Sequence, residues 1–98
     1  RDYETYSGRV LEDYFWEVLR EKGIYTRIGY WHSRNGENEI DIIAQDELEK
    51  VAEFYEVKRQ AKEIDLTTLQ RKVDVFLQTT HEFKSHDIMC KGFSMEDM

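Results

Sequence analysis

The stretch ENEIDIIAQDELEKVAEFYEVKRQ, residues 37–60, decides how this chain folds. It holds two apolar runs of the kind that form buried strands, at residues 39–44 and 51–57, joined by a charged link. The link is too short for a crossover helix, so the two strands are expected to pair as an antiparallel hairpin. Asp41 interrupts the first run, while Glu56 and Lys58 close the second. Charged side chains in core-forming strands are costly to bury, so we expect them to have a functional role.

The segments before this hairpin predict a helix and a strand. Residues 3–22 carry an apolar stripe at steps of three and four, which is typical of an amphipathic helix, and Gly23 is suited to end it. Residues 24–32 are rich in β-branched and aromatic side chains and predict a strand, followed by turn chemistry at residues 33–36. The residues of the helical stripe are Val10, Leu11, Tyr14, Phe15, Val18 and Leu19.

The segments after the hairpin predict a second helix and a last strand. Residues 60–63 form a polar link, and helical spacing returns over residues 66–77 with Asp65 as the expected N-cap. A loop is expected over residues 79–87, then a short strand at 88–90, with Ser94 capping a final helical turn. The order helix, three strands, helix, strand predicts an α/β fold in which helices flank a mixed sheet.

Composition limits the classes of function. With 98 residues the chain is expected to form a single domain, 1–98, and 40% apolar content is enough for a packed core. The net charge of -7 counts against unaided binding of nucleic acid, which usually requires an excess of Lys and Arg. Carboxylates are, however, the ligands that a site for divalent cations needs.

Other features suggest a cytoplasmic piece of a larger protein. No signal peptide or membrane-spanning run is recognisable, so no membrane partner is expected. The lone Cys90 excludes an internal disulfide and suits a reducing cytoplasm. Because the chain starts at Arg1 rather than Met, we expect it to be a fragment of a longer polypeptide.

The charges in the hairpin are expected to meet. Side chains alternate along a strand, so Glu39, Asp41 and Ile43 should share one face of theirs, and Glu56 and Lys58 one face of the next. Two carboxylates about 4 Å apart repel by about 4 kcal/mol at an effective dielectric near 20. A lysine relieves one charge, and a hard cation, Mg²⁺ or Mn²⁺, would relieve the rest.

The short pattern alone has little specificity, because the chain contains a second copy of it. Glu63-Ile64-Asp65 repeats the Glu-Ile-Asp of residues 39–41, and Glu82-Phe83-Lys84 repeats acid-x-Lys. A predicted helix separates the halves of this second copy, and residue 82 follows a polar stretch. Only the first copy lies on two adjacent predicted strands, so only that copy is interpreted as a site.

An acid in one strand and Glu-x-Lys on the next resembles the PD-(D/E)xK nuclease superfamily, whose restriction-endonuclease-like core is also helix, three strands, helix, strand. More narrowly, GRVLEDYFWEVL, WHSRNGENEIDIIA, FYEVKRQ and CKGFS resemble an uncharacterised domain at the C terminus of predicted P-loop ATPases of archaea and bacteria. The resemblance implies a metal-dependent nuclease domain acting on nucleic acid, most simply DNA, within such an ATPase. No GxxxxGK[ST] occurs in this chain, so any ATP-binding part belongs to the remainder of that polypeptide.

Carried over by residue, the superfamily's pattern falls on Glu12, Asp41, Glu56 and Lys58, and some members have a glutamine where Gln70 stands. The resemblance implies that Glu12, Asp41, Glu56 and the carbonyl of Val57 hold Mg²⁺ or Mn²⁺. Lys58 would orient a water or neutralise charge in the transition state. The chain departs from the pattern at Ile40, where a proline is frequent. The basic side chains expected to meet substrate phosphates are Arg27, His32, Arg34, Arg59 and Lys62.

Less specific interpretations remain open. Glu56 and Lys58 could form an ordinary solvated ion pair. Tyr14, Phe15 and Trp16 are better explained by the core than by base stacking, and Trp31 and His32 by packing at a sheet edge. The chain could be a non-catalytic interaction or homo-oligomerisation module of the ATPase, or a toxin or defence component silent until the ATPase acts.

Overall fold

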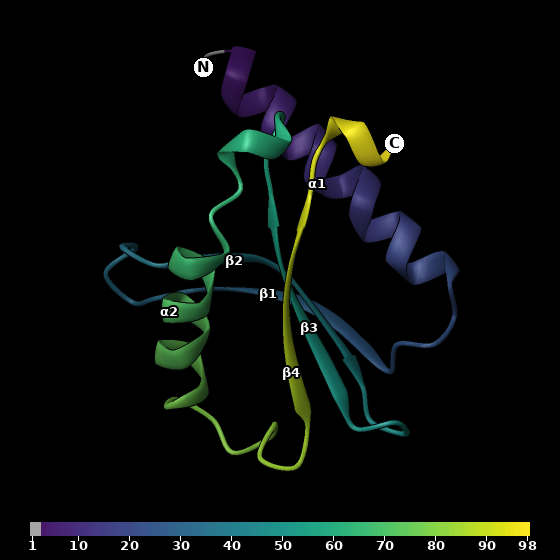
Figure 1. The fold of residues 1–98 in the computed structure, drawn as a ribbon, viewed down its shortest axis with the longest axis vertical. Coiled ribbons are helices and arrows are strands. Elements are labelled where there is room, and N and C mark those ends of the chain that lie inside the picture. The colour runs from purple at the N-terminus through teal and green to yellow at the C-terminus, as the bar shows by residue number, and fades with distance from the viewer. Residues whose placement is uncertain (1–2) are drawn as a thin grey trace.

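The chain forms a four-stranded mixed sheet with one long helix on each face (Figure 1). The computed structural model describes the backbone of residues 3–98 and the side chains of residues 9–98. Within that part, no helix has the length and apolar character needed to cross a membrane. The elements are α1 (Tyr3–Glu21), β1 (Arg27–His32), β2 (Glu39–Asp46), β3 (Val51–Val57), the short η1 (Ala61–Glu63), α2 (Leu66–Leu77), β4 (Asp87–Phe93) and the short η2 (Met95–Asp97).

The sheet has the strand order β1-β2-β3-β4. β1, β2 and β3 pair antiparallel, and β4 adds in parallel to β3. The predicted α/β fold, the hairpin of residues 39–57 and the order of elements are therefore confirmed. β4 is longer than the predicted residues 88–90, because it pairs along all of β3, from Val51↔Asp87 to Val57↔Phe93. Because β3 is distant in sequence, the residues of β4 alone do not indicate how far this pairing extends.

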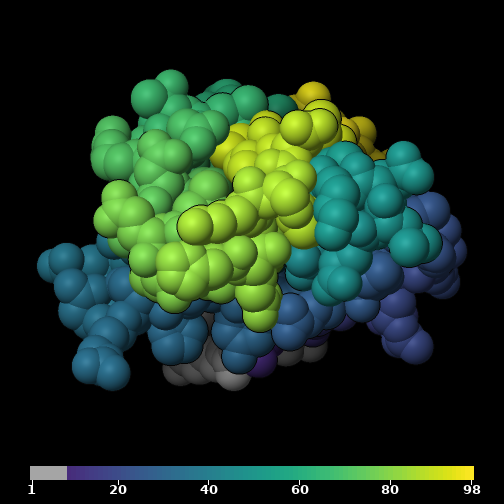
Figure 2. Space-filling view, turned by 90° about the horizontal axis from the view of Figure 1, so that it is seen from below, coloured from purple at the N-terminus to yellow at the C-terminus, as the bar shows by residue number. Residues whose placement is uncertain are grey.

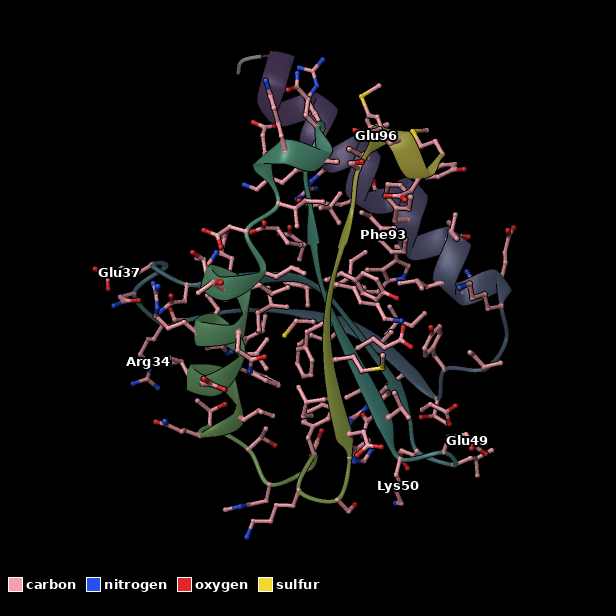
Figure 3. The ribbon with its side chains drawn as sticks, viewed as in Figure 1. Arg34, Glu37, Glu49, Lys50, Phe93 and Glu96 are labelled. Carbon is pink, nitrogen blue, oxygen red and sulfur yellow. The ribbon has the colours of Figure 1, made fainter. Side chains whose placement is uncertain are left out.

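Helix α1 covers one face of the sheet through the predicted stripe. Leu11, Phe15 and Leu19 are buried in one cluster with side chains of β2 and β3. Phe93, at the end of β4, lies between two rings, with centroids 4.2 Å from Phe15 and 4.4 Å from Tyr55 and planes within 3° of parallel. Its ring is labelled in Figure 3 between β4 and α1. These stacked rings fasten the end of β4 to α1.

Helix α2 covers the opposite face. Leu69 and Val73 are buried in a second cluster with Ile40, Ile43 and Phe54. The N-cap is Asp65 as predicted, and its carboxylate accepts hydrogen bonds from the N–H and the hydroxyl of Thr68. Such a cap satisfies a backbone donor that the helix itself cannot pair.

The predicted turn and cap residues have the expected roles. Gly23 ends α1 with φ +68°, in the left-handed region that favours glycine. β2 continues two residues past the predicted end because Asp46 accepts hydrogen bonds from the N–H groups of Leu48 and Glu49 and so starts the hairpin turn. Ser94 caps η2 by accepting the N–H of Glu96, as predicted.

A glycine in β4 lets the chain after η1 lie flat on the sheet. Gly92 pairs with Glu56 of β3, and an added Cβ would come within 2.6 Å of the side chain of Ile64. Because residue 92 has no side chain, Ile64 can occupy that space. The next residue, Asp65, thereby begins α2 beside Glu56.

The first prediction concerns this contact. Gly92→Ala should lower the free energy of unfolding by roughly 1–3 kcal/mol, the usual cost of overpacking, because Ile64 must move. Urea unfolding followed by circular dichroism measures the change. Gly29→Ala is the control, since a Cβ there meets nothing within 4 Å and φ is not positive. Equal stability of the Gly92 variant and the wild type would contradict this account of the contact.

Candidate functional site

The candidate site lies where the ladder between β2 and β3 ends. The last paired residues on this side are Ile42 and Tyr55, so Asp41 and Glu56 are the next residues along the two strands. The Asp41 carboxylate accepts a hydrogen bond from the N–H of Val57 at 2.8 Å, through Oδ2. A side chain thus accepts a hydrogen bond from a backbone N–H at the point where the two strands separate.

A β-bulge in β2 sets which way Asp41 faces. From Gly29 to Trp31, β1 advances by two residues, whereas their partners Ile43 and Ile40 are three residues apart in β2. Ile40 and Ile43 both pack in the α2 cluster, while Ile42 packs in the α1 cluster. One extra residue therefore shifts the alternation of side chains in β2, as a bulge does.

The bulge corrects the prediction that Glu39, Asp41 and Ile43 share one face. Ile43 lies on the α2 face, whereas the shifted alternation turns Glu39 and Asp41 toward the α1 face. The electrostatic coupling agrees, because both carboxylates raise the pKa of Glu12 on α1. Strict alternation failed here because a bulge depends on pairing with another strand.

Glu56 is held from the other side of the strand end. It is 8% exposed, and its Oε1 accepts a hydrogen bond from the N–H of Asp65 at 2.9 Å. Its neighbours Tyr55 and Phe54 pack in the α1 and α2 clusters respectively, so alternation directs Glu56 toward α2. The second oxygens of the Asp41 and Glu56 carboxylates accept no hydrogen bond from residues 9–98.

Lys58 has a fixed backbone and an exposed side chain. Its N–H donates to the carbonyl of Phe93 at 3.0 Å, and the carbonyl of Arg59 accepts the N–H of Met95 at 3.2 Å. No carboxylate among residues 9–98 lies within 4.0 Å of its ammonium group. Its positive charge nevertheless lowers the pKa of Asp41. Lys58 and Glu56 therefore do not form an ion pair in the structure.

The carboxylates around Asp41 carry excess negative charge. Burial, reinforced by the charges of Asp41 and Glu39, raises the pKa of Glu12 to about 7. Burial also raises the pKa of Asp41, with Glu56 and Glu39 adding to the effect and the Val57 N–H and Lys58 opposing it. Sequence reasoning did not assign Glu39 to the site. The sequence feature that could have identified Glu39 is the Glu-x-Asp spacing at residues 39–41.

The carboxylates suit a hard cation that keeps part of its water shell. Within residues 9–98 no three His, Cys, Asp or Glu side chains are grouped as a complete set of direct metal ligands. Mg²⁺ commonly takes one or two carboxylates and retains several waters, so Asp41, with Glu12 through water, is a compatible donor set on the α1 face. Glu56 faces α2 and would reach the same ion only around the strand end. Burial is the main cause of the raised pKa values of Glu12 and Asp41, and a bound cation would offset the cost of keeping these carboxylates charged there.

The other predicted residues are more dispersed. The Gln70 amide donates to Asp74 at 3.0 Å and accepts from the Cys90 thiol at 3.4 Å, so its polar atoms are engaged with α2 and β4. Arg27 forms an ion pair with Glu82 at 2.9 Å, at the end of β1 away from the hairpin tip. Of the remaining basic side chains, Arg59 follows Lys58 directly and Lys62 lies in η1, while His32 and Arg34 lie at and beyond the end of β1. All four are exposed.

The fold and this strand end define a small α/β domain with a carboxylate site between two parting strands. The chain belongs to the family DUF234, described as archaeal and bacterial proteins of unknown function, whose model matches residues 1–91. No curated protein and no solved structure was found to match the chain.

The second prediction concerns pH. The carboxyl of Glu12 normally has a pKa near 4.5, and in the folded chain it rises to about 7. Between these values the folded chain keeps a proton that the unfolded chain loses, so the free energy of unfolding falls as pH rises. Glu12→Gln should be more stable than the wild type at pH 8 by about 1–2 kcal/mol, a figure that allows for solvent screening, with little difference at pH 4.

Urea unfolding at both pH values tests this expectation. Asp13→Asn is the control, because Asp13 is the exposed neighbour of Glu12 on α1. An equal response of the two variants to pH would show that Glu12 is not the group responsible.

Proposed function

We propose that this chain is a metal-dependent nuclease-like domain that hydrolyses phosphodiester bonds of nucleic acid, most simply DNA. In this proposal it works in the cytoplasm as part of a polypeptide with a P-loop ATPase domain. The resemblance to PD-(D/E)xK nucleases, given above, supplies the class of reaction. The observation that carries the proposal is the strand end where Asp41 accepts the N–H of Val57, the residue between Glu56 and Lys58. Glu12 also faces this strand end, and burial, reinforced by the charge of Asp41, raises its pKa to about 7.

The chain's residues have separable roles in this proposal. Asp41, Glu56, the carbonyl of Val57 and, through water, Glu12 would hold Mg²⁺ or Mn²⁺. A bound ion would lower the pKa of a coordinated water and draw charge from the phosphate oxygens. The exposed ammonium of Lys58 would approach the phosphate and offset its growing charge. The hydrogen bonds of the Val57 and Asp65 N–H groups would keep the two carboxylates in place.

The acidic charge of the chain is compatible with this role if other parts of the polypeptide bind the nucleic acid. The net charge of -7 gives the isolated chain little general attraction to phosphates. Gln70, on this proposal, takes part only if it exchanges its bond with Asp74 for one to a water or substrate.

A second candidate function is a non-catalytic module that contacts the ATPase or another copy of the chain. It is favoured by the hydrogen bonds of Asp41 and Glu56 to backbone N–H groups, which also serve a purely structural purpose. Large apolar side chains exposed on α1, on η2 and at the residue after it could supply such a contact, namely Val10, Tyr14, Met95 and Met98.

The third prediction separates the two functions. The wild type should bind Mg²⁺ or Mn²⁺ in calorimetry at millimolar concentration, and Asp41→Asn should weaken binding about tenfold or more by removing a ligand charge. Lys58→Ala should retain the metal but lose roughly a hundredfold or more in plasmid nicking.

The matched control is Lys84→Ala, since Lys84 belongs to the second acid-x-Lys, which lies in a turn. It should leave metal binding and nicking unchanged. The full-length polypeptide should also be assayed on plasmid and RNA, with and without ATP. No divalent binding by the wild type, together with no nicking under any of these conditions, would leave the interaction module as the better account.

A further inference from the structure

Two aromatic side chains lie exposed on the edge strand next to the candidate site. Tyr30 is 67% exposed and His32 is also exposed. Their ring centroids are 6.4 Å apart and their planes are 24° from parallel. A tyrosine exposed to this extent contributes little to the core, so its conformation is not explained by packing.

The face on which these rings lie is fixed by their neighbours. Trp31, between them, points the other way, where it is partly buried with its ring centroid 5.4 Å from that of Phe76 of α2. Alternation therefore places Tyr30 and His32 on the α1 face, beyond the part of the sheet that α1 covers. We define the pair Tyr30 and His32 as the aromatic shelf.

The aromatic shelf borders the carboxylates of the candidate site. His32 pairs directly with Glu39 across the β1–β2 ladder. Tyr30 lies between Gly29 and Trp31, and hence opposite the bulge that contains Asp41. The shelf and the carboxylates Glu39 and Asp41 thus lie on one face, on neighbouring strands.

We propose that the aromatic shelf stacks with unpaired bases of a single-stranded nucleic acid whose backbone passes the carboxylate site. This inference rests on the proposed nuclease function and narrows its substrate to single strands or strands with unpaired ends. The spacing of 6.4 Å is close to twice the rise of a stacked strand, about 3.4 Å per base. Two nearly parallel rings at that spacing suit bases of a single strand.

The covering of base faces in a duplex favours a single strand. In a duplex the base faces are covered by their neighbours, so rings on an exposed strand can stack only where bases are unpaired. Proteins that bind single strands usually combine such rings with a positively charged groove, which a chain of net charge -7 does not supply, so attraction to the phosphates would come from elsewhere in the polypeptide. The phosphate backbone would then be met by few cations, of which Arg34, in the turn after His32, is the nearest in sequence.

The shape of this region leaves room for a strand. The β1–β2 hairpin projects sideways from the body of the molecule (Figure 2). Arg34 and Glu37, labelled at its tip in Figure 3, point away from the sheet. The tip of this hairpin is therefore accessible to a flexible single strand.

The fourth prediction tests the aromatic shelf with fluorescein-labelled oligodeoxythymidine, with Ca²⁺ in place of Mg²⁺ to suppress cleavage. Anisotropy should show that Tyr30→Ser weakens binding by about fivefold or more, the effect of losing one stacked base, and that His32→Ser acts in the same direction. Tyr30→Trp should retain binding. With bromodeoxyuridine in the strand, ultraviolet crosslinks in the wild type should map to Tyr30 or His32.

The matched control is Tyr14→Ser, another exposed tyrosine, which lies on α1 and should not change affinity. Thermal unfolding verifies that each variant is folded. Equal effects of Tyr14→Ser and Tyr30→Ser, crosslinks that map elsewhere, or equally strong binding of a duplex would overturn the inference. Plasmid nicking without shelf crosslinks would overturn the shelf alone. Shelf crosslinks without cleavage would support the shelf as a binding surface and remove the nuclease.

Discussion

The hydrogen bond from the Val57 N–H to the Asp41 carboxylate is the interaction on which the candidate site depends. It closes the ladder between β2 and β3 with a side chain, and so places a carboxylate where the two strands part. Glu56 is fixed beside it because Gly92 admits Ile64 and brings the Asp65 N–H within reach. The packing of both faces of the sheet thus converges on a single strand end, where burial makes charge costly.

The sequence predicted the fold well wherever the signal was local. The helix at residues 66–77, its cap Asp65 and the strand at 51–57 were confirmed with their boundaries, because periodicity and capping act within one element. The full length of β4 and the bulge in β2 were not predicted, since both arise from pairing with distant residues. For the same reason Glu39 was missed as a neighbour of Glu12, although the choice of Asp41, Glu56 and Lys58 was available from the hairpin alone.

On the proposed function, the charge of the domain would restrict how it binds a nucleic acid. An acidic surface offers little long-range attraction, so recognition would depend on short-range contacts at the hairpin and on affinity supplied elsewhere in the polypeptide. On the proposed function, tethering to a larger protein would raise the effective concentration of the nucleic acid at a site that binds it weakly. For that reason, a site that binds weakly in the isolated chain could still be selective in the complete polypeptide.

The bulge in β2 has a consequence for variation in length. Because it is an offset of one residue, deletion of one position there would restore regular alternation while leaving the apolar partners of β1 and β3 available. Such a chain could remain folded and yet lose the Asp41 carboxylate, if that position were the one deleted. A change of one residue in the length of β2 could thus remove the carboxylate site while the fold remains.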